Sequence, residues 1–158
     1  MAGKRRSHQA EPDPRPVAVD DFIYNEPDDS ASPVVSDTPE EAIRKLTAQA
    51  KVYIPQRVSY YAPLLGVHPG RITIRKQKTR WGSCSTKGNL NFNCLLMLTP
   101  PEVIDSVVVH ELCHLIEMNH SDRFYAEVLR VFPDYRRHHS WLRKHGPEIM
   151  ARAFANVR

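Results

Sequence analysis

The fold and the chemistry of this chain are decided by the stretch His110-Glu111-Leu112-Cys113-His114. On a helix, residues four positions apart lie about 40° from each other around the axis and about 6 Å apart along it. Two imidazoles at that spacing can bind one metal ion from the same side. Glu111 lies on the flank of that face, where its carboxylate can reach a metal-bound water. This is the HExxH arrangement of zinc hydrolases, which places two metal ligands and a general base on one turn.

A catalytic zinc ion also needs a third protein ligand and an open fourth position for water. His120 is the predicted third ligand, because the run from His110 to His120 has the ligand spacing of the metzincins, with Glu117 where those enzymes place a glycine. Glu117 lies roughly 10 Å from His110 along a straight helix, so one ion cannot bind both. We expect the chain to bend at Asn119, a residue that tolerates the left-handed helix C-cap. Glu117 is then expected to orient an imidazole or to be a solvated helix residue.

The segment before the motif is predicted to be a buried helix. Its start at Thr99-Pro100-Pro101-Glu102 combines an N-cap Thr, a Pro at the first helical position and a Glu at N3. Apolar residues then occupy most sides of the helix, as in a buried element. They are Val103, Ile104, Val107, Val108, Leu112, Leu115 and Ile116. Histidines in such a helix are costly unless they are paired or bind a metal, which favours the metal site over a chance match.

Four motifs, the third of which contains His110–His114, occur in order between residues 80 and 124, within a similar stretch of about residues 40–145. They are Arg80-Trp81-Gly82-Ser83-Cys84, Gly88-x-Leu90-x-x-Asn93, Pro100-x-x-Val103-Ile104-x-x-Val107-Val108-x-His110-Glu111-Leu112-x-His114, and Asn119-His120-Ser121-x-x-Phe124. With these motifs the chain resembles the YgjP-like metallopeptidase family, which is related to the SprT-like and WLM zinc proteases. The resemblance implies a zincin-like core of the gluzincin or minigluzincin kind. It also implies one zinc ion per chain, held by His110, His114 and His120, with Glu111 as the base.

The site and the resemblance together predict a zinc-dependent metallopeptidase that acts on peptides or unfolded proteins. Zinc lowers the pKa of its bound water to about 7, Glu111 takes the proton, and the hydroxide attacks a polarised amide carbonyl. Three alternatives stay open: a SprT-like protease associated with DNA, a catalytically idle zinc-binding interaction module, and a metallohydrolase of non-peptide amides. The basic folded part would suit DNA. Glu111 argues against the idle module, because its position has no structural need for a carboxylate.

Residues 80–84 allow two interpretations. As structure, Trp81 anchors the core and Gly82 permits a bulge at the end of a strand. As function, the segment leads to a sheet edge beside the predicted helix, where an extended peptide can add as a further strand. Arg80 or Ser83 would then contact the substrate.

Two adjacent histidines near the C-terminus, His138 and His139, also allow two interpretations. Either could donate a hydrogen bond to the oxyanion that forms during peptide hydrolysis. A surface pair in a basic helix is the simpler alternative, and the spacing alone does not separate the two.

Length and composition fit one domain with an appendage. At 158 residues the chain is near the usual size of a single domain. It has no run of about 18 apolar residues and no signal-peptide core, so we expect no membrane span and a cytoplasmic location. Cys84, Cys94 and Cys113 lack CxxC spacing, which argues for reduced thiols and against a Cys-type zinc site.

Residues 1–38 differ from the rest of the chain. They are rich in Pro and carry four Lys and Arg against eight Asp and Glu, a formal charge of −4. Few large apolar residues are present to offset the entropy of ordering, so we predict a disordered acidic tail followed by a domain over residues 39–158. The domain carries eighteen Lys and Arg against ten Asp and Glu, a charge of +8. The charge of the tail either serves solubility, or the tail covers a basic face of the domain that otherwise binds an anionic partner.

The pattern as a whole predicts an α+β fold, with helices packed beside a small antiparallel sheet. Helical stretches show an apolar period near 3.6 and strands show alternation. The predicted elements are a helix capped by Thr38 that Pro55 breaks or kinks, strands over 71–78 and 90–98 joined by a hairpin-like turn at 86–89, the helix with the HExxH motif, a helix capped by Ser121 and broken at Pro133, and a last helix beyond it.

Overall fold

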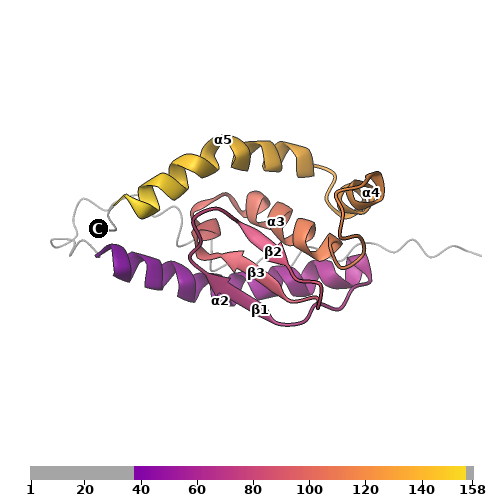
Figure 1. The fold of residues 1–158 in the computed structure, drawn as a ribbon, viewed down its shortest axis with the longest axis horizontal. Coiled ribbons are helices and arrows are strands. Elements are labelled where there is room, and N and C mark those ends of the chain that lie inside the picture. The colour runs from indigo at the N-terminus through magenta and orange to yellow at the C-terminus, as the bar shows by residue number, and fades with distance from the viewer. Residues whose placement is uncertain (1–37, 156–158) are drawn as a thin grey trace, which may run out of the picture.

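The computed structural model describes residues 38–155, so the predicted acidic tail lies outside the described residues apart from Thr38. The elements in chain order are α2 (Pro39–Leu65), β1 (Ile72–Arg75), β2 (Gly82–Cys84), β3 (Leu90–Asn93), the 3-10 helix η2 (Cys94–Leu98), α3 (Pro101–Cys113), α4 (Asp122–Val131) and α5 (Tyr135–Phe154). The central helix α3 lies between α2 and α5 and also packs against β2 (Figure 1). Helices beside a small sheet confirm the predicted α+β class. Within the described part of the chain, no helix is long and apolar enough to cross a membrane.

The long helix α2 begins as predicted and continues where a break or kink was predicted. Thr38 Oγ1 accepts a hydrogen bond from the Glu41 N–H at 3.3 Å, and Glu41 Oε2 accepts one from the Thr38 N–H at 2.9 Å. The assigned helix runs through Pro55 without interruption and ends at Leu65, where Gly66 adopts φ 68°. A proline inside a helix removes one hydrogen bond, and α2 is held in place by packing against α3 and η2.

The sheet is mixed, with strand order β1-β3-β2. The antiparallel pairing predicted for the strands over 71–78 and 90–98 is wrong, and the antiparallel partner of β3 is β2, where Gly82 lies opposite Phe92. β1 instead pairs parallel to β3, with Ile72 opposite Leu90. The turn predicted at residues 86–89 is present, but it joins β2 to β3 rather than β1 to β3. β2 is too short to show an alternating pattern, which is why the sequence did not reveal it.

The strand predicted over residues 90–98 is shorter than expected. β3 ends at Asn93, whose side chain accepts a hydrogen bond from the Leu95 N–H at 3.1 Å and caps the 3-10 helix. The same side chain donates to the backbone oxygens of Gln77 and Arg80 at 2.8 and 2.9 Å. A buried amide with these three contacts turns the chain out of the sheet and ties β3 to the segment that leads into β2.

The helix α3 starts and ends inside the predicted limits. Thr99 does not cap it, because the Thr99 hydroxyl donates to the Leu96 carbonyl at 2.7 Å and the helix begins only at Pro101. Ten of its thirteen residues are buried, as the apolar pattern predicted. It ends at Cys113, so His114 is already its C-cap. This early end decides the geometry of the site.

Candidate active site

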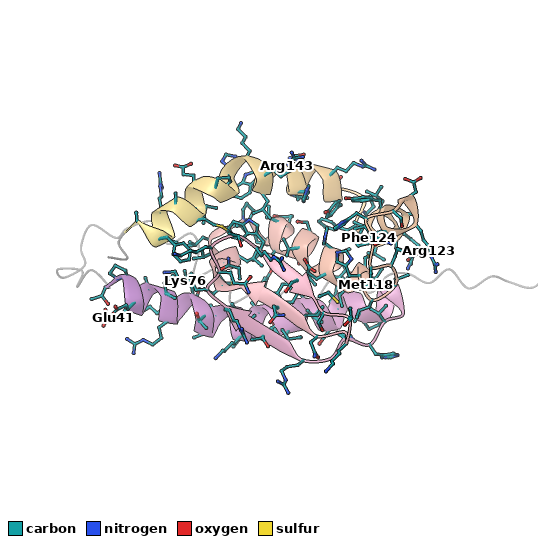
Figure 2. All side chains as sticks on the ribbon, in the orientation of Figure 1. Glu41, Lys76, Met118, Arg123, Phe124 and Arg143 are labelled. Atoms are coloured by element: carbon teal, nitrogen blue, oxygen red, sulfur yellow. The ribbon has the colours of Figure 1, made fainter. Side chains whose placement is uncertain are left out.

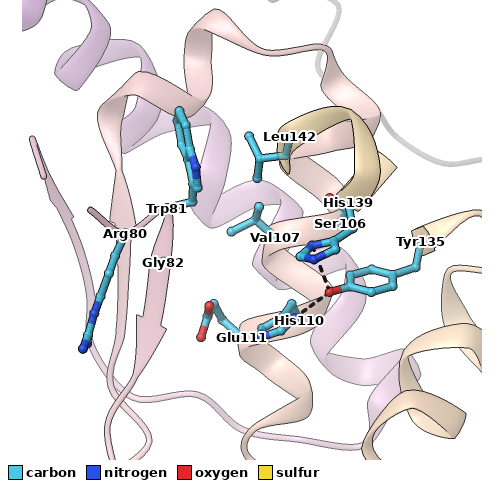
Figure 3. Close-up of a pocket in the computed structure, with 10 residues that line it drawn as sticks. All are labelled: Arg80, Trp81, Gly82, Ser106, Val107, His110, Glu111, Tyr135, His139 and Leu142. Carbon is cyan, nitrogen blue, oxygen red and sulfur yellow. Dashed lines mark hydrogen bonds between the residues drawn. The ribbon is translucent and has the colours of Figure 1, made fainter. Parts of the chain in front are cut away.

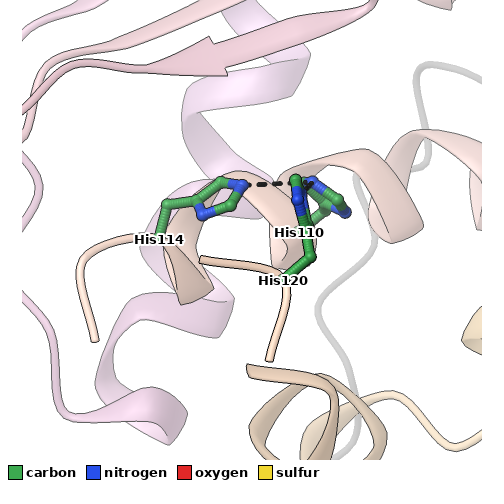
Figure 4. A group of neighbouring side chains, drawn as sticks. All are labelled: His110, His114 and His120. Atoms are coloured by element: carbon green, nitrogen blue, oxygen red, sulfur yellow. Dashed lines mark hydrogen bonds between the residues drawn. The ribbon is translucent and has the colours of Figure 1, made fainter. Parts of the chain in front are cut away.

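Three histidine side chains converge at the end of α3 (Figure 4). His110 Nε2 lies 3.2 Å from His114 Nε2 and 3.1 Å from His120 Nε2. All three ligand atoms lie within 4.8 Å of one another. Nitrogen ligands at 2.0–2.1 Å from one tetrahedral zinc ion are about 3.3 Å apart. The three imidazoles therefore fit a single metal ion.

The turn after α3 brings His120 to the other two histidines. His114, Leu115 and Ile116 donate their N–H groups to carbonyls three residues back, at 3.0–3.3 Å, so the last turn tightens from α to 3-10 geometry. The bend predicted at Asn119 is wrong in its detail, because no residue other than glycine has positive φ within residues 38–155. The reversal comes instead from this tight turn and from Ser121, which caps α4 as predicted by accepting from the Phe124 N–H at 3.3 Å.

The second nitrogen of each of two imidazoles is held by a neighbour. His114 Nδ1 lies 3.2 Å from the backbone oxygen of Glu117. A carbonyl only accepts, so His114 Nδ1 carries the proton and its Nε2 presents a lone pair to the cluster. The contact to the imidazole thus comes from the Glu117 backbone, whereas the Glu117 carboxylate lies 3.9 Å from Arg123 Nη1.

Tyr135 holds the corresponding nitrogen of His110. Its hydroxyl lies 2.8 Å from His110 Nδ1 and 3.4 Å from His139 Nδ1, and its side chain is almost fully buried. If His110 donates to Tyr135, the tyrosine O–H is free to donate to His139, whose ring stacks on the Tyr135 ring at 5.3 Å. Sequence reasoning missed Tyr135, because it lies 25 residues from His110 on another helix and has no motif spacing to it.

Burial favours the neutral form of His110 and His114, which a metal requires. Burial, together with the neighbouring His114, His120 and His139, lowers the pKa of His110 to about 3. Burial also lowers the pKa of His114. The Phe124 ring packs against all three imidazoles at the start of α4, with centroid distances of 5.0, 4.6 and 5.1 Å (Figure 2).

Glu111 lines a small cavity together with His110 (Figure 3). It is 6% exposed, and burial raises its pKa to about 7, with Arg80 opposing the shift. The cavity measures about 160 Å³ and has Trp81 and Leu142 among its walls. Such a carboxylate can take a proton near neutral pH and return it.

Gly82 sets how closely Glu111 approaches the sheet. A Cβ atom at Gly82 would lie 3.0 Å from Glu111 Cγ and 3.2 Å from the Asn91 backbone oxygen. Any larger residue would therefore displace the carboxylate or the strand. The predicted role of Gly82 was a bulge, and close approach is the role that the structure supports.

The other candidate residues divide between the cavity and the rest of the surface. Arg80 and Trp81 line the cavity, and Ser83 does not. His139 lines it as well, whereas His138 packs against the Phe132 ring at 5.6 Å. Of the two histidines considered for the oxyanion, the structure therefore brings His139 to the site. All three cysteines of the chain are free.

Comparison with known proteins agrees with this chemistry, because the family that matches the chain is a family of metallopeptidases. A family model described as the YgjP-like metallopeptidase domain matches residues 16–145. The chain belongs to this family, as the sequence motifs predicted. The match begins inside the segment predicted as a tail, so the domain boundary at residue 38 stays a prediction.

One solved structure is also similar in part. It is the crystal structure of the metallopeptidase zymogen of Methanocaldococcus jannaschii jannalysin, with 25% sequence identity and a TM-score of 0.46. The similarity covers 50% of this chain and 81% of that one. No curated protein sequence matches this chain at a significant level.

Proposed function

We propose that this metallopeptidase domain is zinc-dependent, that His110, His114 and His120 bind one zinc ion per chain, and that Glu111 is the general base. The convergence of three Nε2 atoms at 3.1 and 3.2 Å beside a buried carboxylate is the observation that carries the proposal. Three neutral imidazoles suit zinc among the common metals, and their number leaves a fourth position open. When bound, zinc polarises the scissile carbonyl and acidifies a water molecule.

The protein residues supply the proton transfers and hold the site in shape. Glu111 takes a proton from the attacking water and returns it to the leaving amide nitrogen, because its raised pKa lies near neutrality. Gly82 lets that carboxylate lie against β2. Tyr135 and the Glu117 carbonyl hold the Nδ1 atoms of two histidines, which fixes the orientation of each ring.

The position of β2 supports an extended peptide as substrate. β2 pairs with β3 on one side and has no strand on its other side within residues 38–155. It also packs against α3, and its residue Gly82 lines the same cavity as His110 and Glu111. A peptide or unfolded segment that adds to this edge would place an amide bond at the site. We also propose a cytoplasmic location, which the free cysteines support.

Metal analysis combined with digestion assays tests the proposal. Purified full-length protein should contain one zinc per chain and should cleave an unfolded protein until a chelator is added. Glu111→Gln should keep the metal and the fold but lose hydrolysis, since glutamine keeps the size of the side chain and removes the base. Equal activity of Glu111→Gln and wild type would reject the mechanism, and metal binding without any hydrolysis would favour an interaction module.

A further inference from the structure

Three clefts lie in a row along residues 78–88, the segment that contains β2. The first measures about 640 Å³ and includes Lys78 and Trp81. The second is the catalytic cavity of about 160 Å³, which shares Trp81 with the first. The third measures about 480 Å³ and runs from Lys87 to His114. The candidate metal site lies where the second and third clefts meet α3.

Apart from Glu111, the charged side chains that line these clefts are all cationic. Lys78, Arg80, Lys87 and Arg143 line them, and Glu111 is the carboxylate that they contain. None of the four cations forms an ion pair with another residue in the described part of the chain. Arginines elsewhere on the surface do form such pairs. The pairs are Arg123 with Glu117, Arg130 with Glu127, and Arg152 with Glu148.

The first cleft adds an apolar floor to this row of cations. Its wall on α5 contains Leu142, Met150 and Phe154, and Trp81 closes it towards the catalytic cavity. Lys76 Nζ lies 4.2 Å from the Phe154 ring centroid at its edge, and Lys76 and Arg143 can be followed in Figure 2. Bases could stack on such rings, but β2 offers a free backbone edge, which suits a peptide better than a nucleic acid.

We propose that the three clefts form one groove that selects acidic peptide segments carrying a large apolar side chain. The proposal rests on the proposed peptidase function, because it assigns the substrate class of the same site. Carboxylates of the substrate would lie beside Lys78, Arg80, Lys87 and Arg143, while an aromatic or aliphatic side chain enters the cleft beside Trp81. Complementary charge of this kind raises the rate of encounter and excludes basic segments.

The chain itself provides a natural probe of this chemistry. Residues 20–29 read DDFIYNEPDD, with five acidic side chains around Phe22, Ile23 and Tyr24. A synthetic peptide of this sequence is the acidic probe. Its matched control replaces each Asp with Asn and each Glu with Gln, which keeps the length and the aromatic residues and removes the charge.

Binding of the two labelled peptides to full-length Glu111→Gln protein tests the proposal by fluorescence anisotropy, without any need for hydrolysis. The acidic peptide should bind more tightly, by about twofold to fivefold per charge pair at low salt. Lys78→Glu and Lys87→Glu should each weaken the acidic peptide and leave the neutral one unchanged. Lys51→Glu is the control, because Lys51 is exposed on α2 and lines none of the three clefts.

Equal affinities of the two peptides, or an equal loss in Lys51→Glu, would overturn the proposal. Tighter binding of a single-stranded oligonucleotide than of the acidic peptide, lost in Lys78→Glu, would assign the groove to nucleic acid instead. Failure of the peptidase function has a separate signature: wild-type protein with zinc would leave both an acidic and a neutral unfolded protein uncut. Binding of the acidic peptide can therefore succeed or fail independently of cleavage.

Discussion

The helix α3 carries two polar clusters. They differ in whether other protein groups already fill the hydrogen-bonding positions of their side chains. Towards its start, Asp105 accepts from Arg57 Nε at 2.8 Å and Nη2 at 3.0 Å and from the Tyr61 hydroxyl at 3.1 Å, all of them buried. At its end, His110 and His114 present lone pairs to the same point. The first cluster is closed by protein groups and ties α2 to α3. The second stays open for a cation, which separates a structural polar cluster from a functional one.

The strongest test of this contrast is the loss of metal from the open cluster. We expect His120→Ala to lose its stoichiometric zinc and its activity, because two ligands remain where three are needed. Since His120 is exposed, the fold should survive, and circular dichroism checks this. Glu117→Ala is the matched control and should keep its zinc, because the contact to His114 comes from the Glu117 backbone. Zinc retained in His120→Ala and lost in Glu117→Ala would reverse the assignment.

The closed cluster should respond in stability rather than in metal content. Asp105→Ala leaves the Arg57 guanidinium buried without this carboxylate, and we expect it to lower the free energy of unfolding by about 3–5 kcal/mol. Tyr61→Phe removes one hydrogen bond of the same cluster and should cost about 1 kcal/mol. Urea unfolding measures both. If Asp105→Ala lost its zinc while its unfolding midpoint stayed in place, the two clusters would not be separate.

Much of the open cluster could be predicted from sequence, because its parts are close along the chain. The HExxH spacing and His120 lie within eleven residues, and the structure brings their nitrogen atoms together. The bend was assigned to Asn119 because residue type suggests a left-handed turn, whereas the tight end of α3 depends on packing that the sequence does not display.

The missed features depend on contacts between distant segments. Tyr135 reaches His110 from α5, and Asn93 reaches Gln77 from β3. β2 has only three residues, so no periodic pattern marks it. Because β3 lies between β1 and β2 and pairs with them in opposite directions, the sheet is mixed. The closed cluster of Arg57 and Asp105 was missed for the same reason, since its members are 48 residues apart.

Gly82 gives a way to disturb the base without touching the metal ligands. Gly82→Ala would place a methyl group 3.0 Å from Glu111 Cγ, and we expect kcat to fall by about 100-fold, because a displacement near 1 Å can cost that much. Zinc content should not change. Gly66→Ala is the control for backbone strain: it strains a residue at φ 68° where an added Cβ meets nothing within 4 Å, so it should lower stability by about 1–2 kcal/mol without displacing Glu111. Equal kcat in Gly82→Ala and wild type would remove Gly82 from the site.

Tyr135 tests whether the open cluster needs outside support. Tyr135→Phe removes the hydroxyl 2.8 Å from His110 Nδ1 and keeps the ring, so we expect zinc affinity to fall by about 10-fold to 100-fold. Competition with a chelator measures the affinity. His138→Ala, on the same helix but packed on Phe132, should leave it unchanged. A Tyr135→Phe protein with wild-type zinc affinity would show that His110 is oriented by its packing alone.

The smallest expected effect concerns the charges outside the described residues. Residues 16–38 carry six Asp and Glu and no Lys or Arg, whereas residues 1–15 carry four Lys and Arg and two Asp and Glu. Tethered carboxylates compete with an acidic ligand at high effective concentration. Replacing the six acidic residues with Asn or Gln should therefore strengthen binding of the acidic peptide at low salt, while the melting temperature stays nearly constant.

Salt and a reciprocal variant decide whether that competition is electrostatic. At physiological ionic strength exposed charges act over about 8 Å, so the gain should shrink as salt rises. Replacing the four Lys and Arg of residues 1–15 with Gln removes charges of the opposite sign and should weaken the acidic peptide instead of strengthening it. Equal affinities in all three proteins at low salt would mean that the N-terminal charges serve solubility alone. The function of the open histidine cluster on α3 would then not depend on those charges.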